Sequence, residues 1–170
     1  NPEDIFASSP QLYTIRYLCS LAAGTSRKVY HADCKRAFST TPFKGGKKVY
    51  VKLPKSYIVA EDEEYGIELT NSVYGLKESN SDWEQRLRKV MHGLGFTSSI
   101  QSPTLYLSKD FVALCWVDDL FILPATTTDD PSVATADLIE KVAARLGSKV
   151  DDRGVLATAL GLTFEWGESS

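Results

Sequence analysis

Apolar residues recur at helical spacing in three stretches of the chain, and each stretch has signals for where a helix starts and ends. The start signals are Ser9-Pro10, the Ser81 and Glu84 spacing of a capping box, and Asp130-Pro131. The end signals are Gly24, Gly95 and Gly147. The apolar faces carry Leu12, Ile15, Leu18, Cys19 and Ala22, then Trp83, Leu87, Val90, Met91 and Leu94, then Ile139, Val142, Ala143 and Leu146.

Alternating or continuous apolar runs between these stretches predict strands. The predicted strands are 28–33, 47–54, a short strand within 65–75, then 103–108, 111–117, 119–124 and 155–166. The strand 47–54 is expected to be half-buried and to stop at Pro54. The acidic stretch AEDEEYG (60–66) is expected to be a solvated loop. Helices and hairpins follow one another without regular alternation, which predicts an α+β fold with an antiparallel sheet packed on about three helices. A length of 170 residues suits one domain over 1–170.

Composition places the chain among soluble, globular proteins, with 43% hydrophobic and 24% charged residues. It has neither a bilayer-length apolar run nor a visible signal peptide, so we expect no membrane association. The use of three widely spaced cysteines fits an intracellular location. Because the sequence begins at Asn1 rather than Met, we expect a fragment or a processed form. The net charge of −3 argues against a dedicated nucleic-acid binder but leaves room for a basic groove on a mixed surface.

Cysteine and histidine usage excludes two common kinds of site. Cys19, Cys34 and Cys115 stand far apart without metal-ligand spacing, so we expect reduced core thiols. With His31 and His92 as the only histidines, neither a zinc site nor a histidine-based catalytic triad is expected.

Two adjacent carboxylates, Asp118 and Asp119, interrupt the apolar run FVALCWVDDLFIL (111–123), where they fit the turn of a hairpin. An exposed Asp-Asp turn would leave both charges solvated. Alternatively, the pair binds a divalent cation, since two carboxylates this close need a cation or a proton. Asp33, at the end of another strand, supplies the third carboxylate of a two-ion site for phosphoryl chemistry. Both interpretations stay open at this point.

Four segments occur in an order that resembles the reverse transcriptase of copia-type LTR retrotransposons. They are YHADCKRAF, KKVYVKLP, SVYGLKESNSDW and LCWVDDLFIL. That family carries D-V-K-x-A-F, I-Y-M-x-x-P, L-Y-G-L-K-Q-A-P-R-x-W and Y-V-D-D in the same order. The flanking DIFASSPQLYTIRYLCSLAAG, GLGFTSSIQSPTLYL and TALGLTFEW are also similar to family segments, so the resemblance covers nearly the whole chain.

The resemblance implies a polymerase palm that carries out two-metal nucleotidyl transfer to a primer 3′-hydroxyl. Asp33, Asp118 and Asp119 would be the catalytic, metal-binding carboxylates, with Mg²⁺ or Mn²⁺ as cofactor. The implied nucleotide-binding residues are Cys34, through its carbonyl, Phe38, as a gate against a 2′-hydroxyl, Tyr74, Gly75 and Lys77. The implied primer-side residues are Trp116 and Val117. The implied partners are an RNA or DNA template with primer and a dNTP.

Departures from the family keep a second function open. Trp116 stands where the family has Tyr, and Glu78 to Ser81 replace Q-A-P-R, which puts a negative charge near the template path. The family's basic fingers segment, thumb and RNase H are not found in the sequence. We therefore also consider a retrotransposon-derived, catalytically inactive binding or structural module with a protein partner. A palm-type cyclase shares the paired carboxylates but lacks the Y-G-L-K segment. The resemblance implies a location in cytoplasmic virus-like particles or in the nucleus.

Overall fold

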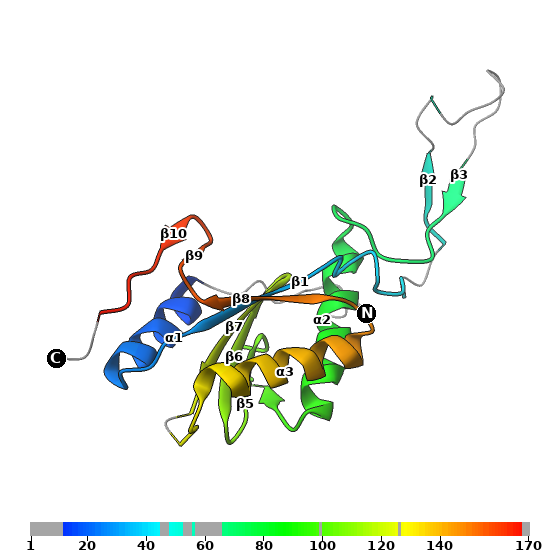
Figure 1. Cartoon of the computed structure of the whole chain (residues 1–170). Helices are drawn as coiled ribbons and strands as arrows, with labels where there is room; N and C mark the ends of the chain where they lie inside the picture. The colour runs from blue at the N-terminus through cyan, green and yellow to red at the C-terminus, as the bar shows by residue number, and fades with distance from the viewer. Residues whose placement is uncertain are drawn as a thin grey trace.

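The computed structural model describes residues 12–44, 48–52, 56, 66–98, 100–125 and 127–167. In these ranges the chain forms three helices and ten strands around one main sheet (Figure 1). The elements are α1 (Leu12–Gly24), β1 (Tyr30–Cys34), β2 (Tyr50–Lys52), β3 (Gly66–Glu68), α2 (Lys77–Gly93), β4 (Thr97–Ser98), β5 (Leu105–Leu107), β6 (Phe111–Trp116), β7 (Asp119–Pro124), α3 (Pro131–Leu146), β8 (Val150–Val155), β9 (Thr158–Ala159) and β10 (Leu162–Thr163).

The main sheet is antiparallel, with six strands in the order β4-β5-β6-β7-β1-β8. β6 and β7 form the predicted hairpin, with Trp116 opposite Asp119 at its closed end. β1 pairs with β7 on one side and with β8 on the other, so β8 is an edge strand. The predicted α+β class with an antiparallel sheet is confirmed.

Helices cover the two faces of this sheet unequally (Figure 1). On one face, α2 and α3 enclose a core that includes Ala32 of β1 and Ile122 of β7. On the other face, α1 and the C-terminal segment pack on Phe121 and Leu123 of β7. Side chains alternate between the faces of a strand, so neighbouring residues of one strand enter different cores.

Two of the three helices match the sequence prediction at the ends that the structure describes. α1 ends at Gly24, while the predicted Ser9-Pro10 cap lies outside the described residues. The Asp130 side chain caps α3 by accepting from the backbone amides of Ser132 and Val133, both at 3.1 Å. Gly147 ends the helix in the left-handed conformation, with φ of 60°.

The predicted capping box at the start of α2 is wrong. The helix begins at Lys77, its N-cap residue Leu76 makes no side-chain cap, and Ser81 lies inside the helix. Polar side chains of the first turns bind neighbouring segments instead. The Ser79 hydroxyl accepts from the Val73 amide at 3.1 Å, and Asp82 accepts from the Lys44 amide at 3.0 Å. These contacts anchor the preceding segments, a role that a local spacing pattern does not reveal.

Two strand predictions are also wrong. β2 is exposed along its length rather than half-buried, because the β2–β3 hairpin projects from the body (Figure 1). The predicted stop at Pro54 and residues 60–65 of the acidic loop lie outside the described residues. The strand predicted over 155–166 is instead the small β9–β10 hairpin, and the sheet strand comes earlier, at β8. β8 reads VDDRGV, so its polar residues hid it from an apolar-run criterion.

All three cysteines are free, and Cys34 and Cys115 are buried, as predicted. No helix in the described part of the chain has the length and apolar character that a membrane span requires.

Asp130→Ala is expected to lower the free energy of unfolding by about 1 kcal/mol, because it removes the acceptor for two amides in the first turn of α3. Urea denaturation measures this change. Asp129→Ala is the matched control, since the described structure gives the Asp129 side chain no hydrogen bond in the cap. Equal losses in both variants would contradict the capping role.

Candidate functional site

The three predicted carboxylates converge at one end of the central strands. Asp33, in β1, is the pairing partner of Asp119, the first residue of β7. Asp118 precedes it in the β6–β7 turn, and its carbonyl accepts from the Cys34 amide at 2.7 Å. Residues directly opposite on antiparallel strands have Cβ atoms about 4.5–5.5 Å apart. Asp33 is thereby brought to the same sheet corner as Asp118 and Asp119, which lie 85 and 86 positions later in the sequence.

Each carboxylate has a partner within the protein. Asp33 Oδ2 accepts from Lys35 Nζ at 2.9 Å and from the Arg153 guanidinium at 3.0 Å. Asp119 Oδ1 lies 2.8 Å from His31 Nε2. Asp118 Oδ2 accepts from the Tyr74 hydroxyl at 3.3 Å. As the side chains stand, the described residues contain no group of three or more His, Cys, Asp or Glu placed to hold a metal ion.

The electrostatics of this corner reflect both burial and charge. Burial alone would raise the pKa of Asp33, but the hydrogen bonds from Lys35 and Arg153 outweigh it and lower that pKa. Burial, then the charges of Asp118, Asp33 and Asp119, raise the pKa of the Cys34 thiol to about 12. The thiol therefore stays protonated. The three carboxylates around this thiol favour a cation beside it and disfavour another anion.

Two other elements hold the turn that carries Asp118. The Trp83 indole of α2 donates to the carbonyl of Val117 at 2.6 Å. The Cys34 amide of β1 donates to the carbonyl of Asp118 at 2.7 Å. Val117 has φ of 56°, a conformation that β-branched residues rarely adopt. Such strain costs about 1–3 kcal/mol and persists only where the surroundings impose it. Trp83, predicted only for its apolar face, therefore also fixes the turn.

Of the predicted nucleotide-side residues, Tyr74 contacts Asp118 and Phe38 packs on Tyr74, while Gly75 and Lys77 follow Tyr74 along the chain; these four form the nucleotide-side strip. Phe38 is buried, with 2% exposed, and its ring meets the ring of Tyr74 edge-on at 4.5 Å. Tyr74 is 66% exposed, so Tyr74 rather than Phe38 offers its ring to solvent. Gly75 has φ of 94°, a conformation that strains other residues, and Lys77 is exposed at the start of α2. Val117 is also exposed at the turn.

Trp116, predicted on the primer side, is partly buried. It packs against the core under α1.

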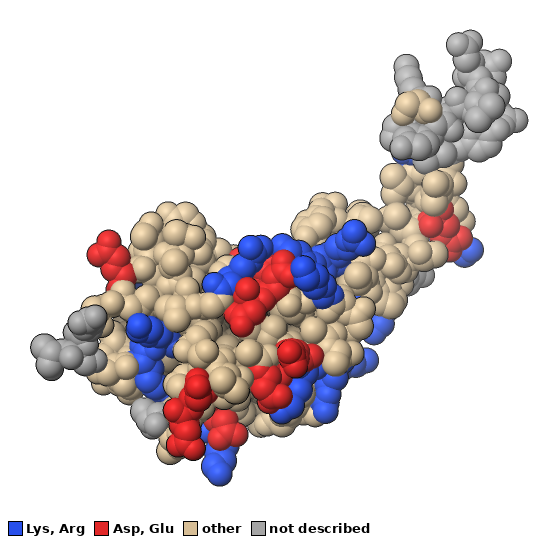
Figure 2. Space-filling view, in the orientation of Figure 1, with Lys and Arg blue, Asp and Glu red and all other residues tan. Residues whose placement is uncertain are grey.

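Sequence reasoning missed three side chains that touch the carboxylates. His31 and Lys35 lie two residues to either side of Asp33, so strand alternation alone could have placed His31 beside it. Arg153 comes from β8, a strand that the sequence pattern did not predict. Figure 2 shows acidic and basic side chains side by side over the part of the surface where β8 runs.

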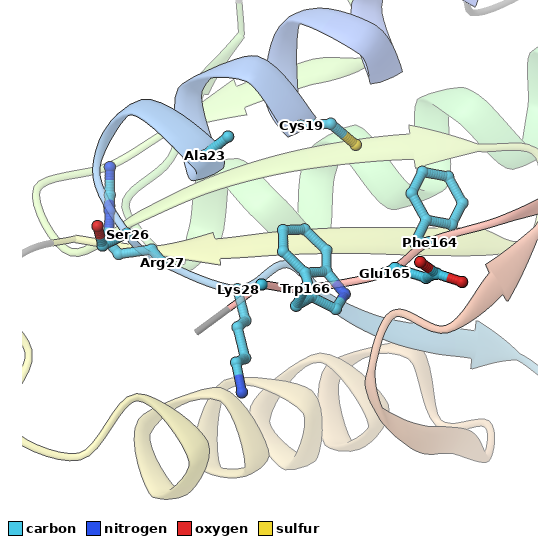
Figure 3. A pocket seen from close by; sticks show the side chains of 9 residues that line it. Cys19, Ala23, Ser26, Arg27, Lys28, Phe164, Glu165 and Trp166 are labelled. Atoms are coloured by element: carbon cyan, nitrogen blue, oxygen red, sulfur yellow. The ribbon is translucent and has the colours of Figure 1, made fainter. Parts of the chain in front are cut away.

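Two pockets lie on the side of the sheet that α1 covers only in part. One, of about 320 Å³, opens at Asp33 and is lined by His31, Asp33, Arg153, Val155, Ala157 and Thr158. The other, of about 650 Å³, lies between the end of α1 and the C-terminal segment (Figure 3). Cys19 points into it from α1, and Trp166 lies across it. Its described lining includes none of the predicted site residues, so it is a separate feature.

Comparisons with known proteins give one consistent result. Residues 2–166 match the family model described as reverse transcriptase (RNA-dependent DNA polymerase). The Pol polyprotein of transposon TNT 1-94 from Nicotiana tabacum is 25% identical over 126 residues, which are 71% of this chain and 9% of that protein. The Pol polyprotein of transposon RE1 from Arabidopsis thaliana is 27% identical over 124 residues, 71% of this chain and 8% of that protein. The chain thus spans less than a tenth of these relatives.

Trp83→Phe is expected to loosen the β6–β7 turn, because it removes the indole donor to Val117 while keeping an aromatic ring in the core. The Cys115 thiol still donates to the same carbonyl, at 3.2 Å, so the change removes one of two hydrogen bonds and costs about 0.5–1.5 kcal/mol. We expect a loss of that size in urea denaturation, with faster amide hydrogen exchange at the turn by NMR.

Trp166→Phe is the matched control, because Trp166 makes the same kind of bond, to the Leu156 carbonyl at 2.6 Å, in the other core. It should lower stability without faster exchange at the β6–β7 turn. The same exchange rates at the turn in both variants would show that Trp83 does not hold it.

Proposed function

The chain belongs to the reverse transcriptase (RNA-dependent DNA polymerase) family, of the copia type, and from this membership we propose that it is the palm of an RNA-directed DNA polymerase. It would join the 3′-hydroxyl of a primer to the α-phosphate of a dNTP along an RNA or DNA template, breaking the bond between the α- and β-phosphates and releasing pyrophosphate. The observation that best supports this is the β1–β7 register, which sets Asp33 opposite Asp119 with Asp118 in the adjacent turn.

Asp33, Asp118 and Asp119 would hold Mg²⁺ or Mn²⁺, because hard cations prefer carboxylate oxygens, and the Cys34 carbonyl would add another oxygen. The donor set fits such a cation: the side chains of Asp33 and Asp119 are 24% and 30% exposed, and carry carboxylates that solvent reaches. When bound, two such ions stabilise the charge that develops on the transferred phosphate and favour ionisation of the attacking hydroxyl.

The remaining residues of the strip position the substrates. Tyr74 presents its ring beside Asp118, and Phe38 supports that ring from below, so the pair would set the space available at the sugar 2′ position. Gly75 allows close approach of the substrate to the backbone, and Lys77 offers a cation to its phosphates. Val117 would lie along the primer end. Catalysis in this proposal is mainly positioning and charge stabilisation.

A second candidate is a retrotransposon-derived module that binds a partner without catalysis. The ion pairs of Asp33 with Lys35 and Arg153 favour it, since they neutralise the carboxylate without a metal ion. The net charge of −3 favours it as well, because a polyanion binds such a surface poorly. Divalent-cation binding and primer extension separate the two candidates.

Asp118→Asn is expected to reduce primer extension at least about 100-fold, because it removes a charge that faces the transferred phosphate. The assay uses the chain alone and the chain extended by the flanking sequence of its parent gene, with a primed RNA template and dNTPs. Asp110→Asn, at the opposite end of the same hairpin, should extend like the unaltered protein. The polymerase proposal fails if neither form extends a primer, or if Asp118→Asn extends normally.

Titration calorimetry with Mn²⁺ tests the cofactor independently of activity. We expect the unaltered chain to bind Mn²⁺, and Asp33→Asn and Asp119→Asn each to weaken binding at least tenfold, since each removes a charged oxygen ligand. No binding heat from the unaltered chain, together with a stable complex with a protein partner, would support the non-catalytic module instead.

A further inference from the structure

We propose that Arg153 exchanges partners during the reaction: it pairs with Asp33, and it binds a substrate phosphate when Asp33 binds a divalent cation. This inference rests on the proposed function and adds to it a phosphate-binding residue from the edge strand β8. Neither the position of Arg153 nor its charge was part of the site predicted from the sequence.

Arg153 lies at a β-bulge of the edge strand β8. The β1–β8 pairing runs from Ala32 opposite Asp152 to Tyr30 opposite Val155, so two steps on β1 face three on β8. Gly154 takes φ of 71° at this point, and its amide donates to Asp152 Oδ1 at 2.7 Å. Bulges with a left-handed glycine are common at sheet edges and beside active sites, where they redirect a side chain. Asp151 pairs with Asp33, so strand alternation places Arg153 on the same face, and its guanidinium reaches Asp33 just before the bulge.

The contact itself leaves Arg153 able to bind a second anion. Arg153 and Lys35 both donate to the same oxygen, Asp33 Oδ2, at 3.0 and 2.9 Å. One carboxylate balances one of these two cations, while Lys35 also reaches Asp151, at 3.6 Å. The Arg153 side chain is 48% exposed, and its guanidinium has five N–H donors. Charge and donors are therefore available to a ligand from solvent.

The chemistry around Arg153 favours a sugar-phosphate unit. A planar guanidinium matches the oxygens of a phosphate with two parallel hydrogen bonds. The pocket of about 320 Å³ beside it is lined by charged or polar groups and also by the aliphatic side chains of Val155 and Ala157, so it can take an anion joined to a less polar ring. Both a primer phosphodiester and a dNTP triphosphate carry that chemistry.

Arg153 and a divalent cation compete for the Asp33 carboxylate, and this competition can be measured. A divalent cation and Arg153 both bind the Asp33 carboxylate, so removing Arg153 should strengthen cation binding. The same change should weaken binding of the phosphate ligand. A purely structural role for Arg153 would weaken both, because the site as a whole would be less well formed.

The experiment compares the unaltered 170-residue chain with Arg153→Gln. We expect the Mn²⁺ dissociation constant, from calorimetry, to fall about two- to fivefold, the range for a partly exposed ion pair. We expect fluorescence anisotropy to show weaker binding of a labelled primer–template, with the slope of log K against log salt smaller by about one phosphate contact. A dNTP titration is the second arm: a loss of dNTP affinity alone assigns the phosphate to the triphosphate.

Lys149→Gln is the matched control, because Lys149 pairs with Asp151 at 2.7 Å and the structure gives it no contact with Asp33. It should leave both affinities close to those of the unaltered chain. The inference is overturned if Arg153→Gln weakens Mn²⁺ binding or leaves phosphate binding unchanged, or if Lys149→Gln has the same effects. If the unaltered chain binds neither Mn²⁺ nor primer–template, the proposed function itself is lost.

Discussion

β1 and β7 pair one strand in from the β8 edge of the main sheet, and their register decides where the carboxylates of the candidate site lie. A slip of one residue would turn each side chain of β1 to the opposite face. Burial opposes that slip: Ala32 and Cys34 lie in the core under α2 and α3, and a slip would exchange them for His31 and Asp33. The hydrophobic core on one face thus positions the acidic group on the other. The chemistry depends on packing that never touches a substrate.

Around this register, the protein places its own cations and donors against each acidic group. Lys35 and Arg153 meet Asp33, His31 meets Asp119, and the hydroxyl of Tyr74 meets Asp118. These partners come from β1 itself, from β8 and from the segment before α2. They offset the repulsion between carboxylates that lie close together. The same arrangement couples ligand binding to these contacts, because a ligand that binds one of the carboxylates competes with the protein side chain bound to it.

Much of the fold can be predicted from local sequence patterns, and the carboxylates of the site can be predicted from several motifs taken together. Asp130 and Gly147 mark the ends of α3 because caps are local. The Asp118-Asp119 turn stands out because a charged pair interrupts an apolar hairpin. Local patterns do not reveal contacts between segments that are distant in the sequence. β8 is polar because it is an edge strand beside the charged corner, so its residues do not look like a strand. Ser79 and Asp82 bind other segments of the chain instead of capping α2. For the same reason Arg153 and the turn-holding bond of Trp83 were not foreseen.

The position of β1 in the sheet also bears on how the chain is made. β1 ends at Cys34, yet its two neighbours are β7 and β8, which end at Pro124 and Val155. During synthesis, both hydrogen-bonding edges of this strand stay unsatisfied until most of the chain has emerged. Such non-local pairing slows folding and leaves strand edges open to other chains. The β7-β1-β8 side of the sheet is therefore completed only after β8 has been made, and until then the open edges of β1 leave the nascent chain prone to aggregate.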